Sequence, residues 1–215
     1  MHITGAIFDM DGTLLNSMDY WAIASSEYLR SKGIEPFSEC DRHFLEDGMK
    51  VWYQTAVTKG LDADFESAYA GIYAIMDKYY NTEVKLKAGA YDMLVRLKEN
   101  GVKMCLATAT DAASVEKILT RLGIFSFFDG VFTAGQVGKG KRFPLIYEKA
   151  LEFLGTDKES TYVFEDAYYA INTCYNAGFK IVGIYDKNVY VPKEQIIPLC
   201  DIYLDEDQNY NFDIE

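Results

Sequence analysis

The sequence predicts an α/β protein in which a helical segment interrupts a doubly wound parallel sheet. Six short apolar runs recur along the chain, and most are too apolar for a sheet with one face in water. They lie at residues 3–8, 102–107, 131–134, 161–164, 181–184 and 202–204. Helical patterns alternate with most of them, which is typical of parallel strands joined by crossover helices.

Four helical patterns are expected between the strands. They cover residues 89–99, 112–122, 144–154 and 167–177, and each is followed within two residues by a glycine, at Gly101, Gly123, Gly155 and Gly178. Glycine commonly ends a helix because it adopts the left-handed backbone conformation without steric penalty. These elements together predict a Rossmann-like core with helices on both faces of the sheet.

Residues 17–81 break the alternation. They hold no convincing strand but three amphipathic patterns, at residues 20–31, 48–58 and 64–80. We therefore expect an all-helical domain at 17–81, inserted after the first strand, and a core formed by residues 1–16 and 82–215. Two linkers then cross the boundary, which allows a hinge between the two parts. The acidic residues 205–215 are expected to be a solvated end.

The chain is acidic, with 21 basic and 33 acidic side chains in 215 residues and a formal net charge of -12. This charge repels polyanions, so we expect neither nucleic acid nor a membrane as the main partner. A small anionic substrate would need local positive charge from a metal ion or from a few lysine and arginine side chains.

Other residue types narrow the chemistry further. Cys40, Cys105, Cys174 and Cys200 form no CxxC pair and are expected to be reduced thiols. With only two histidines in the chain, zinc clusters and histidine-based triads have little to work with. The sequence shows no signal-like leader and no run of the roughly 20 apolar residues that span a membrane, so we expect a cytoplasmic protein. We also expect a monomer.

The strongest motif is Asp9-Met10-Asp11-Gly12-Thr13, placed where the first apolar run ends. Open α/β sheets bind their ligands at this edge. Asp9 can then serve as nucleophile and metal ligand, while Asp11 gives a proton to the leaving group and takes one from water. Gly12 allows a sharp turn and Thr13 can hydrogen-bond within it. The alternative, an ordinary Asp-Gly turn, does not explain the second aspartate.

This motif resembles the nucleophile motif of the haloacid dehalogenase superfamily, and the resemblance extends over nearly the whole chain. The superfamily places a Thr or Ser after the next core strand, and here Thr108 follows residues 102–107. The resemblance therefore implies that the hydroxyl of Thr108 and the amide of Ala109 bind phosphate oxygens. By itself, a threonine after a strand is usually a turn residue.

The superfamily's third motif is a lysine shortly before a helix. Lys141 is in register with it, because Pro144 matches a proline of the family pattern, although the family's first proline and its aspartate are replaced here. Lys141 would neutralise the Asp9 carboxylate and the transferring phosphoryl group. Lys139 is the competing candidate, and for either lysine the alternative is a solvated loop cation.

The fourth motif is an acidic pair after a core strand, supplied by Glu165 and Asp166. The resemblance implies that they join Asp9 and the backbone carbonyl of Asp11 in a Mg²⁺ site. An isolated pair of this kind would more often cap a helix, and Asp166 could do both. The family's usual Ser and Gly after the pair are replaced by Ala167 and Ala170.

The helical insert resembles the cap of the branch that contains β-phosphoglucomutase and phosphoglycolate phosphatase. Such caps choose the leaving group, so its candidate specificity residues are Arg42, His43, Lys50, Trp52 and Tyr53. The resemblance implies a Mg²⁺-dependent phosphatase that hydrolyses a small phosphorylated metabolite through a phosphoaspartyl intermediate. Two alternatives stay open, a phosphosugar mutase and a non-catalytic binding protein on this scaffold. The mutase is disfavoured because Trp21 stands where β-phosphoglucomutases carry a histidine.

Overall fold

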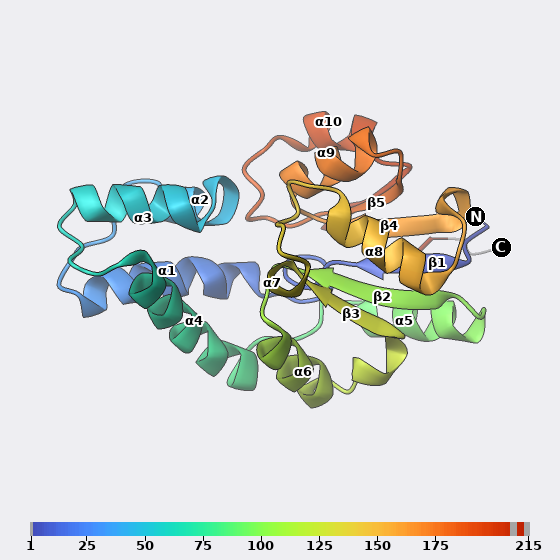
Figure 1. Cartoon of the computed structure of the whole chain (residues 1–215), viewed down its shortest axis with the longest axis horizontal. Coiled ribbons are helices and arrows are strands. Elements are labelled where there is room, and N and C mark those ends of the chain that lie inside the picture. Colours follow the sequence, from blue (N-terminus) through green and yellow to red (C-terminus); the bar gives the residue numbers. More distant parts are fainter. Residues whose placement is uncertain (1, 207–209, 213–215) are drawn as a thin grey trace. The chain divides into compact units, whose positions relative to one another are not determined.

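The core of the protein is a parallel sheet of six strands, in the order β3-β2-β1-β4-β5-β6. The computed structural model describes residues 2–206 and 210–212 (Figure 1). The strands are β1 (Gly5–Phe8), β2 (Lys103–Thr108), β3 (Gly130–Thr133), β4 (Thr161–Glu165), β5 (Lys180–Ile184) and β6 (Ile202–Leu204). The prediction of a doubly wound parallel sheet is confirmed.

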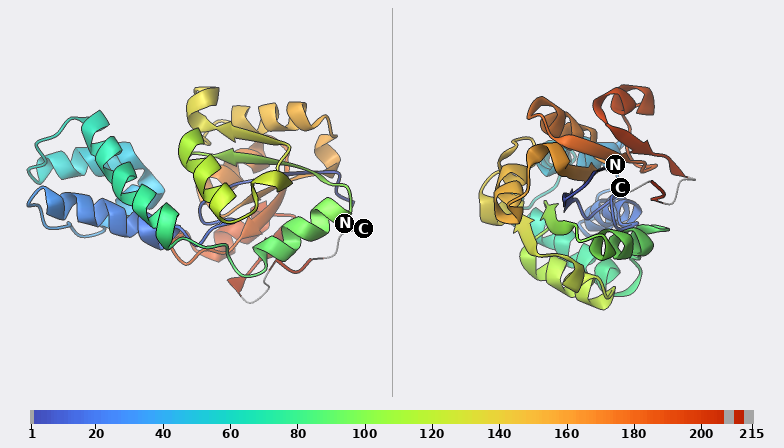
Figure 2. Two further views of the ribbon diagram at one scale, coloured as in Figure 1. Left: turned by 90° about the horizontal axis from the view of Figure 1, so that it is seen from below. Right: turned by 90° about the vertical axis from the view of Figure 1, so that its right-hand side faces the viewer.

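Helices cover both faces of this sheet, as α5 and α8 on opposite sides of it illustrate (Figure 2). The expected helices are α5 (Ala90–Glu99), α6 (Ala112–Arg121), α8 (Leu145–Leu154) and α9 (Tyr168–Asn176). Shorter helices that the sequence did not indicate are α7 (Ala134–Val137), α10 (Lys193–Ile196), η2 (Phe125–Phe127), η3 (Lys158–Ser160) and η4 (Ile197–Leu199). Left-handed glycines follow the four longer helices, with φ between 61° and 73° at Gly101, Gly123, Gly155 and Gly178.

The chain divides into two compact units. One comprises the residues up to Asn16, Lys85–Lys187 and the chain from Val191 onward, and the other comprises Ser17–Val84 and Asn188–Tyr190. The second unit is helical, with α1 (Met18–Ser31), α2 (Cys40–Arg42), η1 (His43–Asp47), α3 (Met49–Thr58) and α4 (Phe65–Thr82). That the two units act as a catalytic core and a cap stays a prediction.

Aromatic side chains pack the helical unit. Trp52 is fully buried and its indole N–H donates to Sγ of Cys40 at 3.2 Å. Tyr28 of α1 is also buried, and its ring lies against Gly71 of α4 so closely that a Cβ on Gly71 would overlap the ring. The glycine therefore lets α1 and α4 approach each other.

Gly71→Ala should lower the free energy of unfolding by roughly 1–2 kcal/mol, because overpacking against the Tyr28 ring outweighs the better helix propensity of alanine. Urea denaturation measures the change. The matched control is Gly135→Ala, where a Cβ would lie 4.0 Å from the hydroxyl oxygen of Thr133 and no positive φ is required. If Gly71→Ala is as stable as the control, close packing of α1 on α4 is not what this glycine provides.

Strand β1 lies at the centre of the sheet and carries the first half of the site. All its side chains are buried, and Phe8 is in register with Leu106 of β2 on one side and Phe164 of β4 on the other. The rings of Phe8 and Phe164 stack with centroids 4.3 Å apart. The chain runs from β1 towards β2 and later from β3 across to β4, so the strand order reverses beside β1.

The expectation of a solvated end at residues 205–215 is wrong at Tyr210 and Phe212, whereas Glu206 and Asn211 are exposed. Tyr210 is 5% exposed and Phe212 is 9% exposed, and the Phe212 ring packs on Phe164 with centroids 5.8 Å apart. Residues 207–209 and 213–215 lie outside the described residues. These two aromatic side chains, two positions apart, are buried although the segment is acidic, because burial of an aromatic ring is favourable while the polar side chain between them stays in water.

The two main linkers of the helical unit meet within the core. The amide of Asn16 donates to the carbonyl of Lys85 at 3.0 Å, and the Asn16 side chain accepts from the amide of Lys85 at 2.8 Å. The amide of Lys87 then donates to the carbonyl of Leu14 at 2.9 Å. The chain thus leaves the core and returns to it at adjacent residues.

Two expectations from composition can be compared with the described residues. The four cysteines are free thiols, and Cys40, Cys105 and Cys174 are buried. Within the described part of the chain, no helix has the length and apolar character needed to cross a membrane.

Candidate active site

The candidate site lies at the carboxyl ends of β1 and β4, where the strand order reverses. Asp9 directly follows β1, and its amide donates to the carbonyl of Phe164 at 2.9 Å. Because Phe8 pairs in register with Phe164, Asp9 comes level with Glu165, the last residue of β4. Parallel strands thereby bring two acidic residues, 156 positions apart in the numbering, to one edge of the sheet.

The loop after Asp9 turns back on itself. The amides of Leu14 and Leu15 both donate to the carbonyl of Met10 at 2.9 Å, and Gly12 takes a φ of +80°. A Cβ on Gly12 would overlap the carboxylate of Asp166. Glycine is therefore required here twice, for the left-handed conformation and for the close approach of Asp166.

Lys141 enters the site between two carboxylates. It is 4% exposed, and its Nζ donates to Oδ1 of Asp9 and to Oε1 of Glu165, the latter at 2.5 Å. Lys139 is exposed, with its Nζ 5.0 Å from the centroid of the Phe143 ring. Of the two candidate lysines, the structure therefore brings Lys141 to Asp9.

Asp9, Glu165 and Asp166 form a buried carboxylate cluster, with one oxygen from each within 4.8 Å of the others. Thr13 donates its hydroxyl to Oδ1 of Asp166 at 2.8 Å, whereas Oε2 of Glu165 is buried with no hydrogen-bond partner among the described residues. An unpaired carboxylate oxygen inside a protein is costly unless a cation offsets it. Hard carboxylate oxygens suit Mg²⁺ or a similar ion, so these residues fit a divalent metal.

The charges in this cluster are not balanced by Lys141 alone. Burial raises the pKa of Asp9 to about 8 against the attraction of Lys141, and Glu165 and Asp11 raise it further. Burial also raises the pKa of Asp166 well above its usual range, with repulsion from Asp9 and Glu165 adding to it. For Lys141, burial favours the neutral amine, but the Asp9 and Glu165 carboxylates outweigh it and raise its pKa. A bound cation would stabilise the ionised carboxylates.

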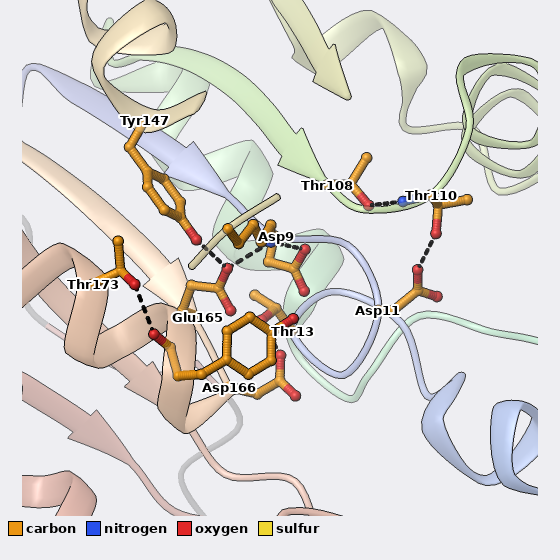
Figure 3. A network of polar contacts seen from close by, with 11 residues as sticks. Asp9, Asp11, Thr13, Thr108, Thr110, Tyr147, Glu165, Asp166 and Thr173 are labelled. Carbon is orange, nitrogen blue, oxygen red and sulfur yellow. Dashed lines mark hydrogen bonds and ion pairs between the residues drawn. The ribbon is translucent and has the colours of Figure 1, made fainter. Parts of the chain in front are cut away.

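Tyr147 of α8 is a site residue that the sequence analysis missed. Its ring is fully buried, and its hydroxyl donates to Oε1 of Glu165 at 2.8 Å (Figure 3). Tyr147 and Lys141 therefore donate to the same oxygen and leave Oε2 to face elsewhere. The only sequence signal was a tyrosine on the inward face of the helix after Lys141, which reads as an ordinary core residue.

The other predicted residues line the loop after β2. The carboxylate of Asp11 accepts a hydrogen bond from the hydroxyl of Thr110 at 2.7 Å, so it points to this loop and is not part of the carboxylate cluster (Figure 3). The hydroxyl of Thr108 is buried and accepts from the amide of Thr110 at 3.1 Å, and Ala109 is exposed. Thr110 was not predicted, because a second threonine in a turn carries no signal of its own.

The idea that Asp166 caps a helix is wrong. The residue before α9 is Ala167, which makes no side-chain cap, and the Asp166 carboxylate accepts from Thr13 instead. Asp166 is therefore held by the loop that follows Asp9, because Gly12 leaves room for its carboxylate there.

The candidate specificity residues of the helical unit have local partners. Nη1 of Arg42 lies 3.7 Å from Oε1 of Glu39, and Nδ1 of His43 lies 2.8 Å from Oδ2 of Asp47. The hydroxyl of Tyr53 donates to the carbonyl of Ala63 at 2.9 Å, Trp52 is buried, and Lys50 is exposed. Their role in specificity stays a prediction.

Fold and site together define an α/β protein with a buried carboxylate cluster at the carboxyl edge of a parallel sheet. The family model described as haloacid dehalogenase-like hydrolase matches residues 6–184. The chain belongs to this family, and the expected resemblance is confirmed. Membership of this family also confirms the prediction that the protein is an enzyme of the hydrolase class.

Curated relatives and solved structures agree with this family. The chain is 27% identical over 184 residues to the phosphorylated carbohydrates phosphatase of Thermotoga maritima, covering 83% of each protein. It is also 27% identical to the phosphoglycolate phosphatase of Pseudomonas putida, covering 83% of this chain and 68% of that protein. It matches 18% of the much longer SUPPRESSOR OF QUENCHING 1 of Arabidopsis thaliana.

The structure of CbbY from Rhodobacter sphaeroides, solved in complex with phosphate, superposes with a TM-score of 0.80. The match covers 94% of this chain and 93% of that chain at 20% identity, and it supports the fold.

In protein treated with a chelator, the free energy of unfolding should fall as the pH rises from about 5 to about 8. The pKa of Asp9 is raised to about 8 in the folded state, so the folded protein keeps a proton that the unfolded chain has released. Each such proton contributes up to about 1.4 kcal/mol per pH unit. Urea denaturation at several pH values measures the slope, which Asp9→Asn should flatten; an equal slope in the variant contradicts the assignment.

Proposed function

We propose that this hydrolase is a Mg²⁺-dependent phosphatase that hydrolyses a small phosphate monoester through a phosphoaspartyl intermediate on Asp9. The observation that carries the proposal is the burial of Lys141 against Asp9 and Glu165, with Asp166 beside them. This arrangement keeps a carboxylate nucleophile in a water-poor site and surrounds it with groups that can neutralise a phosphoryl group. The phosphatase names of two relatives support the same reaction.

In the first step, a carboxylate oxygen of Asp9 attacks phosphorus in line with the ester oxygen. A bond from Asp9 to phosphorus forms, the bond from phosphorus to the ester oxygen breaks, and the departing alkoxide takes a proton from Asp11. The hydrogen bond from Thr110 to Asp11 holds that carboxyl group to one side of Asp9. Lys141 stabilises the charge on the transferring group.

In the second step, water attacks phosphorus of the phosphoaspartate. Asp11, now ionised, accepts a proton from the water, and the bond between Asp9 and phosphorus breaks to release inorganic phosphate. The hydroxyl of Thr108 and the amide of Ala109 would hold phosphate oxygens during both steps. These roles are carried over from the family motifs. The hydrogen bond from Thr110 to Asp11 supports them, because it holds the loop after β2 against Asp11.

The metal ligands would be Asp9, Glu165 and Asp166, together with the backbone carbonyl of Asp11. When bound, Mg²⁺ offsets the charge of the anionic nucleophile and the anionic ester. The donor set supports this cofactor because Oε2 of Glu165 is buried and has no hydrogen-bond partner within residues 2–206 and 210–212. Lys141 and Tyr147 hold the other oxygen of Glu165 and so fix the orientation of the carboxylate.

The proposed substrate is a small phosphorylated metabolite, and the helical unit would act as a cap that selects its leaving group. A phosphosugar mutase is the alternative reaction on the same core. Trp21 disfavours it, because its indole lies 7% exposed among aromatic rings and cannot act as a base. A monomer in the cytoplasm stays a prediction.

Asp9→Asn should abolish phosphate release, lowering kcat on the order of 10³-fold or more, because the amide is not a nucleophile. The assay measures inorganic phosphate from a panel of small phosphate esters, with and without Mg²⁺. The isosteric variant keeps the shape of the site, so circular dichroism serves as its folding control. Full activity in Asp9→Asn would rule out the phosphoaspartyl route, and no release by either protein would favour a mutase or a binding protein.

Asp11→Asn should lower turnover of an alkyl phosphate by about 10²–10⁴-fold, the usual contribution of a general acid. Turnover of p-nitrophenyl phosphate should fall less, since nitrophenolate leaves without a proton. Thr110→Val should lower turnover of the alkyl phosphate by about tenfold or less, and turnover of p-nitrophenyl phosphate by a smaller factor. The effect is smaller than that of Asp11→Asn because the variant keeps the Asp11 carboxyl group and removes a hydrogen bond that orients it. Because Asp11 also acts in the second step, which both esters share, the comparison uses the rate of the first turnover. An equal loss on both esters in that turnover would contradict the role of Asp11 in leaving-group protonation.

A further inference from the structure

Tyr210 contacts the loop that follows Asp9. The hydroxyl of Tyr210 donates to the backbone carbonyl of Thr13, and both residues are buried. Tyr210 has a left-handed backbone with φ of 57°, which is uncommon for a side chain of this size. A tyrosine holds such a conformation only where the surrounding contacts determine it.

Those contacts come mainly from Arg96 of α5. Its Nη2 donates to the carbonyl of Tyr210 at 2.7 Å, and its Nη1 donates to the carbonyl of Phe212 at 3.3 Å. The guanidinium also lies 5.7 Å from the centroid of the Phe212 ring, which packs on Phe164 of β4. Residues 210–212 are thus tied to the sheet and to a helix by separate contacts, independently of the hydrogen bond to Thr13.

Thr13 connects this segment to the carboxylate cluster. Its carbonyl accepts from Tyr210, and its own hydroxyl donates to Oδ1 of Asp166 at 2.8 Å. Thr13 is fully buried, so its side chain has little freedom to take another position. Two hydrogen bonds thus link Tyr210 to Asp166 through Thr13, one at its backbone carbonyl and one at its hydroxyl.

We propose that Tyr210 is a positioning residue of the metal site, which fixes the Asp166 carboxylate by holding Thr13 in place. The inference rests on the proposed function only in taking Asp166 as a ligand of Mg²⁺. Groups that orient a metal ligand from behind affect metal affinity although they do not touch the ion. The hydrogen bond from Tyr210 acts one step further out, because it fixes the residue that orients the ligand.

Tyr210→Phe removes only the hydroxyl and keeps the buried ring. Isothermal titration calorimetry of Mg²⁺ into the full chain should show Kd raised roughly fivefold, the factor that corresponds to one hydrogen bond. The matched control is Tyr79→Phe, which removes a tyrosine hydroxyl that donates to Glu27 in the helical unit, and its Kd should equal that of wild type. The thermal midpoint in EDTA reports on folding separately from metal binding.

A double-mutant cycle tests the route through Thr13. In Thr13→Val the hydroxyl that reaches Asp166 is absent, so adding Tyr210→Phe should weaken Mg²⁺ binding by much less than fivefold. Arg96→Gln, which loosens the anchor of residues 210–212, should also raise Kd. The neighbouring Lys98→Gln, which removes only an exposed pair with Asp129, should not.

A Kd unchanged by Tyr210→Phe and by Arg96→Gln overturns the proposal, even if both variants are less stable in EDTA, because the segment would then serve packing alone. Fully additive losses in the cycle also overturn it, since Tyr210 would act by another route. If wild type binds no Mg²⁺, the proposed cofactor fails and this inference fails with it, whereas binding by wild type with equal Kd in the variants refutes this inference alone.

Discussion

The ion pairs of Lys141 with Asp9 and Glu165 are the interaction on which the site depends. Removing three charged groups from water costs several kcal/mol for each, and mutual attraction recovers this only in good geometry. The geometry comes from the sheet, since the β1 and β4 register aligns Asp9 with Glu165, and from the turn before α8 that delivers Lys141. A protein selected for stability alone would place apolar residues here, so the cluster marks a place where stability is given up for chemistry.

This arrangement also explains how an acidic protein would bind the anionic substrate that we propose for it. The chain carries a formal net charge of -12, and its overall field repels a phosphate ester. Attraction has to be local, and burial makes it strong because the dielectric constant around Lys141 is low. Tyr147 adds a neutral donor on the same carboxylate and so aligns Glu165 without adding charge.

Much of the fold and the centre of the site could be predicted from the sequence. The strands are nearly continuous apolar runs, Asp9 directly follows β1, and Glu165 and Asp166 stand at the end of β4, so parallel topology brings the three together. From the sequence, the choice of Lys141 over Lys139 as the site lysine depended on the position of Pro144 in the family motif. In the structure the choice is clear because Lys141 is buried and Lys139 is exposed. Thr110, Tyr147 and Tyr210 could not be found, because each acts through a tertiary contact with a residue 99, 18 or 197 positions away. The burial of Tyr210 and Phe212 could not be predicted from the acidic composition of residues 205–215, because net charge does not show where individual aromatic side chains pack.

The meeting of the two linkers at Asn16 and Lys85 has a consequence for how such a protein can change over evolutionary time. The chain leaves and re-enters the core at hydrogen-bonded neighbours. In terms of chain connectivity, the helical segment is therefore one long loop whose two ends are held together at Asn16 and Lys85. Closing a longer or shorter loop alters the entropy only slowly with length. Segments of different size and composition could therefore be exchanged at this junction while β1 and the residues after it keep their positions. If the helical unit is the cap proposed above, the part of the chain that selects a substrate can change in evolution without altering the stretches that hold the carboxylate cluster.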